Sequence, residues 1–170
     1  MSAGNDADRL TERLVGWEPD ETGTLLFVVR ASEVLLIRKK RGHGAGKING
    51  PGGKIEPGET PLASARRETR EETGVDALDA ALAGQFRFVE LNGPQWYGYV
   101  FVAHRFSGTP HETAEADPFW CRIDSLPFDE MWEDDRHWLP RVLAGERLTG
   151  DFLFDDGRLL AHRLETLPAS

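Results

Sequence analysis

The segment from Gly53 to Gly74, GKIEPGETPLASARRETREETG, constrains the fold of this chain more than any other part of the sequence. Thr60 is a typical N-cap residue, and Pro61 is typical of the first turn of a helix. A glycine such as Gly74 commonly ends a helix in the left-handed conformation. The segment therefore predicts a glycine turn, a helix over residues 61–73 and a second turn.

Three carboxylates crowd the end of this predicted helix. Glu68, Glu71 and Glu72 stand at positions i, i+3 and i+4, so they share one helical face. Like charges repel there, and the helix dipole disfavours negative charge at the C-terminal end. A solvated acidic face is the simplest interpretation, but a bound cation would offset both costs. Oxygen ligands without nearby His or Cys suit Mg²⁺ or Mn²⁺.

The remaining sequence predicts one α+β domain. The chain has 170 residues, 39% of them hydrophobic, which is enough to bury a core. A second helix is expected after Asp134-Asp135, with Pro140 in its first turn. Apolar runs between turn residues predict strands at 24–29, 33–38, 84–91, 95–106, 118–123, 152–154 and 158–164. Mixed strands and helices of this kind indicate an α+β fold.

Composition and charge exclude several classes of protein. The net charge of −9 argues against general nucleic-acid binding. No apolar run approaches the ~20 residues of a membrane span, and the N-terminus lacks a secretory signal pattern. The single cysteine, Cys121, cannot form an internal disulfide, and we expect it to be a small core residue. We expect a cytoplasmic monomer that binds a small molecule, not a membrane.

Two segments differ in composition from the rest of the chain. Residues 1–22 are polar, and we expect a flexible N-terminal extension before a domain that spans 23–167. Residues 38–54 contain six Lys or Arg side chains and no acidic residue. This segment is either a solvated basic loop or an anion site within an acidic protein. We expect His43 in this loop to be exposed, although it could instead border a pocket or meet a phosphate.

The segment that begins at Gly53 resembles the Nudix box. That pattern is Gly, five residues, Glu, seven residues, Arg-Glu, an aliphatic residue, any residue, Glu-Glu, any residue, Gly and an aliphatic residue. The chain supplies Gly53, Glu59, Arg67, Glu68, Glu71, Glu72, Gly74 and Val75. The one departure is Thr69 in the first aliphatic position, where its shape is close to that of valine.

The resemblance implies a Nudix fold, with a mixed β-sheet sandwiched between helices and the box forming a loop–helix–loop. It implies that Glu68, Glu71 and Glu72, with the carbonyl of Gly52, hold Mg²⁺, for which Mn²⁺ can substitute. In such enzymes the metal lowers the pKa of a water that attacks phosphorus. The general base is a box glutamate or a loop carboxylate. We expect Glu59 and Arg67 to pair and tie the loop to the helix.

Two further segments, residues 38–54 and 128–140, resemble the oxidised purine nucleoside triphosphatases of this family. The resemblance implies cleavage of 8-oxo-dGTP, and of 2-hydroxy-dATP, to the monophosphate and pyrophosphate. Nucleotide-pool sanitation would follow from that activity. The alternatives are a Nudix hydrolase of ADP-ribose, a dinucleoside polyphosphate or undamaged nucleoside triphosphates, or a non-catalytic nucleotide-binding module.

A purine site needs a flat apolar slot and edge-on hydrogen bonds. Trp132 could stack on the base, with Phe88 and Trp96 as walls. Asp134 and Asp135, sharing one proton, would offer acceptors and a donor to guanine or 2-hydroxyadenine. Taken alone, the aspartates could be a helix N-cap and Trp132 a core residue.

Four more residues complete the predicted site. Asn49 would read the opposite edge of the base, Thr24 would lie on the pocket floor, and Lys39 would reach the site. Glu115 matches a remote metal-binding carboxylate of the family, although in isolation it is only a charge on a loop.

Overall fold

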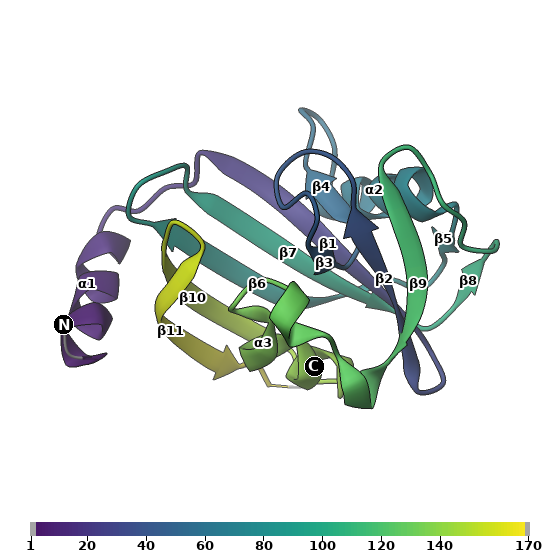
Figure 1. The fold of residues 1–170 in the computed structure, drawn as a ribbon. Coiled ribbons are helices and arrows are strands. Elements are labelled where there is room, and N and C mark those ends of the chain that lie inside the picture. The colour runs from purple at the N-terminus through teal and green to yellow at the C-terminus, as the bar shows by residue number, and fades with distance from the viewer. Residues whose placement is uncertain (1–2, 169–170) are drawn as a thin grey trace.

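The computed structural model describes residues 3–168 and has an α+β architecture (Figure 1). The helices are α1 (Ala3–Leu14), α2 (Pro61–Thr73) and α3 (Asp135–Leu143), with short 3₁₀ turns at Ile123–Ser125 and Phe128–Glu130. The strands are β1 (Glu21–Arg30), β2 (Glu33–Lys39), β3 (Ile48–Asn49), β4 (Gly52–Lys54), β5 (Asp76–Ala77), β6 (Ala81–Glu90), β7 (Trp96–Ala103), β8 (Phe106–Ser107), β9 (Ala116–Arg122), β10 (Leu148–Asp155) and β11 (Arg158–Thr166).

The main sheet is mixed, as the Nudix resemblance predicts. Its strand order is β11-β10-β6-β7-β1-β2-β3, with β4 paired to β1 and β9 paired to β2. The β1–β7 and β6–β10 pairs are parallel, and the other pairs are antiparallel. Strands β5 and β8 form a separate two-stranded sheet.

Helices α2 and α3 cover opposite faces of the main sheet. Along β1, successive side chains point to opposite faces. Phe27 joins the core that contains Trp138 of α3, whereas Leu26 and Val28 join a second core with Ala65 of α2. The prediction of a sheet sandwiched between helices is therefore confirmed.

Both ends of α2 follow the sequence signals. The Thr60 hydroxyl accepts a hydrogen bond from the Ala63 N–H at 3.1 Å. Gly74 has φ 82°, and its N–H donates to the Arg70 carbonyl. A residue with a Cβ would be strained at this positive φ.

The buried face of α2 explains the one departure from the box pattern. Thr69 is fully buried, and its hydroxyl donates to the Ala65 carbonyl at 2.7 Å. The polar atom is therefore satisfied, and the rest of the side chain packs like valine. The helical spacing predicts that Leu62 packs on the same face. The residue is instead 40% exposed.

The prediction of a flexible extension over residues 1–22 is wrong for most of that segment. Residues 3–14 form α1, and β1 already begins at Glu21. Leu10 is fully buried against Val89 and Leu153, with Leu14 packed beside it. Two leucines four residues apart give α1 a narrow apolar stripe, which the polar composition of the segment obscured. Residues 1 and 2 lie outside the described part of the chain.

The second helix also differs from expectation in one respect. Because α3 begins at Asp135, Pro140 lies in its second turn and not in its first. A proline there cannot bond to the carbonyl four residues earlier, that of Arg136. Both residues are exposed, so water can satisfy that carbonyl.

Cys121 packs, partly buried, against the core that contains Trp138. Burial raises the pKa of its thiol, which disfavours the nucleophilic thiolate. Both observations agree with the prediction that Cys121 is a packing residue.

Within residues 3–168, no helix is both long and apolar enough to span a membrane.

Candidate active site

Glu72, in the last turn of α2, is a buried carboxylate that contacts the glycine loop, residues 50–53. Its side chain is only 3% exposed, and Oε1 accepts a hydrogen bond from the Gly52 N–H at 2.8 Å. Burial raises the pKa of Glu72 to about 7, and the negative charges of Glu68 and Glu115 add to the rise. The bond from Gly52 opposes the shift without cancelling it.

Glu68 lies directly beneath the same loop. A Cβ placed on Gly53 would stand 2.7 Å from its carboxyl carbon, and one on Gly52 would stand 1.8 Å from the Thr24 carbonyl oxygen. Burial raises the pKa of Glu68 as well. The absence of a Cβ therefore allows Gly53 to approach Glu68 and allows Gly52 to pack closely on β1.

The structure does not bring Glu71 and Glu115 to the same point. Glu71 is 54% exposed and lies 3.3 Å from Arg67, whereas Glu115 lies 3.7 Å from Arg41. Over residues 3–168, no three His, Cys, Asp or Glu side chains are arranged to hold a metal ion. Arg67 lies among the box carboxylates instead: its Nη1 is 3.0 Å from Glu68 and 3.3 Å from Glu71.

The donor chemistry nevertheless fits a divalent cation. Glu72 is buried and Glu68 is partly buried, and burial raises the pKa of both carboxyls, so a further positive charge near them would stabilise their ionised forms. Carboxylate and carbonyl oxygens are the ligands that Mg²⁺ prefers. Glu71 and Glu115 belong to adjacent, exposed segments, and side-chain rotation could direct them toward the same ion.

The predicted pair of Glu59 and Arg67 is present. Arg67 Nε lies 2.7 Å from Glu59 Oε2, and Nη2 lies 2.9 Å from Oε1, which is a bidentate arrangement. The hydrogen bonds from Arg67 lower the pKa of Glu59 to about 2. Arg67 also donates to Glu68 at 3.0 Å, so the pair ties the loop to the carboxylates.

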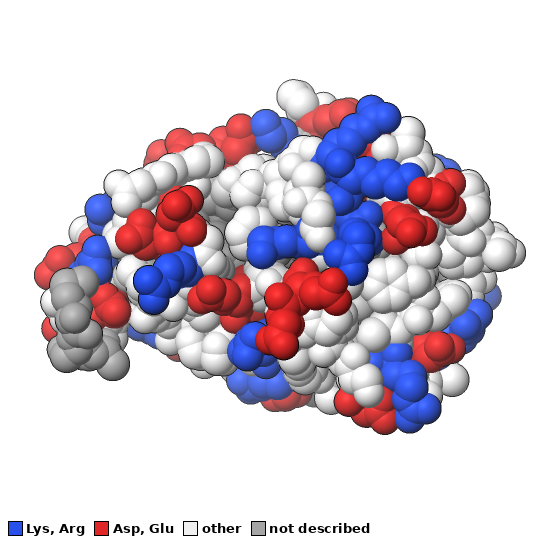
Figure 2. Space-filling view, in the orientation of Figure 1, with Lys and Arg blue, Asp and Glu red and all other residues white. Residues whose placement is uncertain are grey.

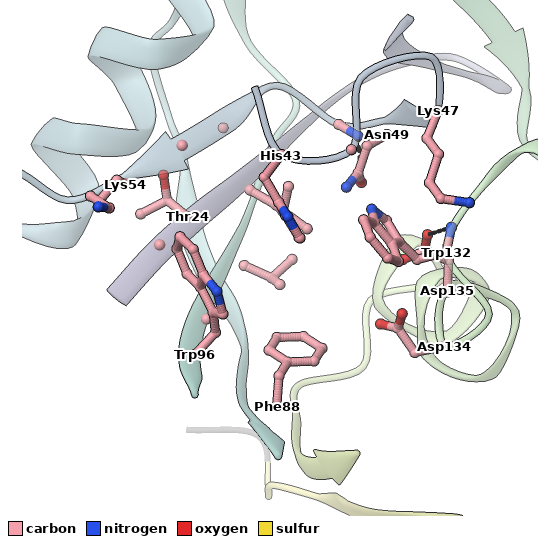
Figure 3. Close-up of a pocket in the computed structure, with 18 of the residues that line it drawn as sticks. Thr24, His43, Lys47, Asn49, Lys54, Phe88, Trp96, Trp132, Asp134 and Asp135 are labelled. Atoms are coloured by element: carbon pink, nitrogen blue, oxygen red, sulfur yellow. Dashed lines mark hydrogen bonds between the residues drawn. The ribbon is translucent and has the colours of Figure 1, made fainter. Parts of the chain in front are cut away.

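A cavity of about 550 Å³ opens beside the glycine loop (Figure 3). Gly52 and Gly53 form part of its wall, which places the cavity next to Glu68 and Glu72. Its size suits a small organic ligand. All eight predicted substrate-binding residues line it, namely Thr24, Lys39, Asn49, Phe88, Trp96, Trp132, Asp134 and Asp135.

Trp132 has a partner on each side of its ring. His43 stacks on it, with ring centroids 5.0 Å apart and planes 18° apart, and the Lys47 ammonium lies 4.9 Å from the ring centroid. Figure 3 shows Trp132 between these two side chains. His43 also stacks on Trp96, with centroids 5.9 Å apart. The cavity therefore contains three near-parallel rings, and a base that stacks on Trp132 must take the place of His43 or Lys47 on its face.

His43 is exposed, as predicted, yet it also borders the cavity. Burial of part of the ring, helped by the charge of Lys39, lowers the pKa of His43. The ring is therefore neutral at pH 7.

Lys47 also lines the cavity and was not predicted as a site residue from the sequence. It stands at the end of the basic loop, directly before β3, and its place in the basic segment beside Asn49 is the signal that the sequence offered.

The basic segment is mostly neutralised by acidic partners. Figure 2 shows Lys and Arg side chains gathered over β2 and β3, with acidic side chains among them. Four of the six basic residues are ion-paired, as Arg38–Glu130, Lys40–Glu112, Arg41–Glu115 and Lys54–Glu21. Within residues 3–168, Lys39 and Lys47 make no such ion pair, and both line the cavity. The positive charge available to a ligand therefore lies at these two lysines.

Asp134 and Asp135 are both buried at the cavity wall. Asp134 accepts a hydrogen bond from the Trp138 indole at 2.8 Å, and Asp135 accepts one from the Trp132 backbone N–H at 3.0 Å. Asp134 makes no N-cap bond with its side chain, so the interpretation as a simple helix cap is wrong.

Burial sets the protonation of the aspartate pair. It raises the pKa of Asp134 to about 6 and raises the pKa of Asp135 well above its usual value, with the charge of Asp134 adding to the effect on Asp135. Two buried carboxyls side by side disfavour a second negative charge, which favours a pair that shares one proton. A carboxylate and a carboxylic acid side by side present acceptors and a donor to a ligand.

Two further residues offer hydrogen-bonding groups. Thr24 is 4% exposed, and its buried hydroxyl has no hydrogen-bond partner within residues 3–168. Buried polar atoms are rarely left unpaired, so this hydroxyl is a candidate contact for a ligand. Asn49 Oδ1 accepts the Gly50 N–H at 2.8 Å, which leaves the carboxamide NH₂ as the group to offer.

Comparison with known proteins agrees with this geometry. The family model described as the NUDIX domain matches residues 20–142. The chain belongs to the Nudix family. It is 40% identical over 144 residues to the zebrafish (Danio rerio) oxidized purine nucleoside triphosphate hydrolase, covering 84% of this chain and 92% of that protein. Identity to the mouse (Mus musculus) protein of the same name is 39% over 134 residues, covering 78% and 86%.

The fold of this Nudix protein is similar to that of a MutT protein from Bacillus halodurans. The TM-score is 0.76 and the identity 31%, with 85% of this chain and 97% of the other covered. The resemblance inferred from the box is thus confirmed, and the protein is an enzyme of a family that acts on phosphoric anhydrides. Nudix hydrolases generally use divalent metal cations.

Proposed function

We propose that this protein hydrolyses oxidised purine nucleoside triphosphates, 8-oxo-dGTP and 2-hydroxy-dATP, to the monophosphate and pyrophosphate. The observation that carries the proposal is the buried aspartate pair in an aromatic cavity beside the box carboxylates. The names of the vertebrate relatives support the same substrate class. Removal of these nucleotides would cleanse the nucleotide pool before DNA synthesis.

Recognition of the base follows from the protonation of the pair. A guanine edge presents N–H donors beside the O6 acceptor, and Asp134 and Asp135, sharing one proton, offer the matching acceptors and donor. Transfer of the shared proton from one carboxyl to the other would suit the different edge of 2-hydroxyadenine. Stacking on Trp132, with Phe88 and Trp96 as walls, would fix the plane of the base.

The remaining residues would bind the phosphates and a metal ion. We assign Mg²⁺, for which Mn²⁺ can substitute, to Glu68, Glu71 and Glu72, with the Gly52 carbonyl and Glu115 as further ligands. When bound, a divalent ion supplies charge neutralisation on the phosphates and lowers the pKa of a water. Lys39, whose charge already lowers the pKa of both buried glutamates, would hold the phosphate chain near them.

We further propose that the protein acts on free nucleotides as a cytoplasmic monomer that binds neither nucleic acid nor membrane. Its net charge of −9 disfavours general binding to a phosphate backbone. Its single cysteine is compatible with a reducing compartment.

Product identification tests the chemistry. We expect 8-oxo-dGTP to give 8-oxo-dGMP and pyrophosphate in the presence of Mg²⁺, with turnover lost on adding EDTA and restored by excess Mg²⁺ or Mn²⁺. Chromatography of the nucleotide and an enzymatic pyrophosphate assay measure both products. Release of inorganic phosphate, or faster cleavage of ADP-ribose, would instead indicate a Nudix hydrolase of another substrate. Binding without turnover would indicate a non-catalytic module.

A further inference from the structure

Gln95 connects the wall of the cavity to the N-terminal segment. It stands between Pro94 and Trp96, both of which line the cavity. Its Oε1 accepts hydrogen bonds from the Trp17 indole at 2.8 Å and from the Glu90 N–H at 3.0 Å. Its Nε2 donates to the carbonyls of Glu90 and Gly93 at 2.8 and 3.0 Å. One side chain therefore closes the β6–β7 turn and holds Trp17 against it.

The backbone of Gln95 is bonded to the same N-terminal segment. Its N–H donates to the Asp20 carboxylate at 2.7 Å, and its carbonyl accepts from the N–H groups of Asp20 and Glu21 at 2.8 and 3.0 Å. All the polar groups of the residue are thus engaged, although it lies near the surface. So many bonds at one residue fix the start of β7 relative to the start of β1.

Helix α1 covers the outside of this wall. Leu10 is buried against Val89, a residue that lines the cavity, and Trp17 packs at the edge of the same cluster. Figure 1 shows α1 beside the β10–β11 end of the sheet, with its connection to β1 passing the β6–β7 turn. The match to the Nudix family model begins at residue 20, so α1 and Trp17 lie before the matched region.

The position of the Trp96 ring depends on β7 and β1, the two strands whose starts Gln95 holds together. A Cβ on Gly23 of β1 would stand 3.3 Å from the Trp96 ring, so the ring packs directly on that strand. Trp96 follows Gln95 in the chain, and its ring forms one end of the stack with His43. A shift of the turn or of β1 would therefore move the ring that faces the base.

We propose that Gln95 is a positioning residue that, through Trp17 and α1, holds the Trp96 wall in place and so sets the affinity for the base. The inference rests on the proposed function, because it takes the cavity as the base site. The box carboxylates Glu68 and Glu72 lie on α2, which none of the hydrogen bonds of Gln95 reaches, although β4 pairs with β1 beside Gly23. We therefore expect the tether to act on binding of the base more than on the chemical step.

Two variants and a control test the tether. Trp17→Phe retains an aromatic ring but removes the N–H donor, and Gln95→Ala removes all the side-chain bonds of Gln95 while keeping its backbone bonds to Asp20 and Glu21. Val15→Ala is the matched control, since Val15 is 82% exposed in the same segment. For 8-oxo-dGTP we expect Trp17→Phe to raise KM about fivefold, the effect of one net hydrogen bond, with kcat unchanged. Gln95→Ala should raise KM further, and adding Trp17→Phe to it should have no additional effect.

A second readout does not depend on the substrate. Amide hydrogen exchange of the nucleotide-free protein should become faster over residues 89–96 in both variants, with residues 61–73 and the Val15→Ala protein unchanged. Faster exchange without turnover of 8-oxo-dGTP by the parent would support the tether and refute the proposed substrate. An unchanged KM, a fall in kcat alone, or unchanged exchange in the folded variants would overturn the positioning proposal.

Discussion

Replacing Glu72 with glutamine should lower kcat by a factor on the order of 10³ while leaving the protein folded. Glutamine retains an acceptor oxygen for the Gly52 N–H, so the bond that closes the loop on the helix is kept. What is lost is the negative charge that a divalent cation would require. Steady-state kinetics at saturating Mg²⁺ measure the effect, with Glu165→Gln, an exposed site on β11, as the matched control.

Thermal unfolding separates loss of metal binding from loss of folding. Mg²⁺ should raise the Tm of the parent and of Glu165→Gln, because an ion that binds only the folded state stabilises it by mass action. The Glu72→Gln protein should show a similar Tm without Mg²⁺ and a much smaller rise with it. A variant that retains kcat within about threefold of the parent would refute the assignment of Glu72 to the metal site.

Asp134→Asn and Asp135→Asn should each lower kcat/KM for 8-oxo-dGTP by about 100-fold, with little change in the Mg²⁺ concentration needed for half-maximal activity. Asn can no longer switch between donor and acceptor, so one buried hydrogen bond to the base is left unpaired. The measurement is kcat/KM as a function of nucleotide at fixed Mg²⁺. If both variants match the parent, the aspartates do not read the base.

The pH dependence of stability checks that these variants are folded. Folding raises the pKa of Asp134 from 3.8 to about 6, so the folded state binds more protons than the unfolded state between these values. The stability contributed by this group therefore falls as pH rises through that window. The Asp134→Asn variant lacks this titrating carboxyl. Its free energy of unfolding minus that of the parent should therefore increase from pH 4 to pH 6, as measured by urea titrations. The opposite slope would contradict the raised pKa.

The box helix, most strands and the residues of the cavity could be predicted from the sequence because their signals are local or belong to the family pattern. Thr60 and Gly74 mark the helix ends by their own chemistry. Asn49 and Trp132 belong to segments that resemble those of related enzymes, and both line the cavity.

The features that were missed depend on contacts between distant residues. Helix α1 is held by Leu10 against Val89 and Leu153, and its local signal in residues 1–22 is only the spacing of Leu10 and Leu14. The shared helical face predicted that Glu71 would join the other carboxylates, but Arg67 competes for it. The position of Lys47 over Trp132 likewise arises only when β3 and the segment before α3 come together.

The ratio of kcat/KM for 8-oxo-dGTP to that for dGTP, measured with Mg²⁺ under identical conditions, tests the central claim most directly. We expect a ratio well above ten, because the Asn49 NH₂ would donate to the O8 that dGTP lacks, whereas the aspartate pair meets an edge that both nucleotides share. We also expect 2-hydroxy-dATP to be preferred over dATP, because the aspartate pair would contact the added hydroxyl. A ratio near one, or preference for dGTP, would leave the Nudix chemistry intact and contradict the assignment of this cavity to oxidised purines.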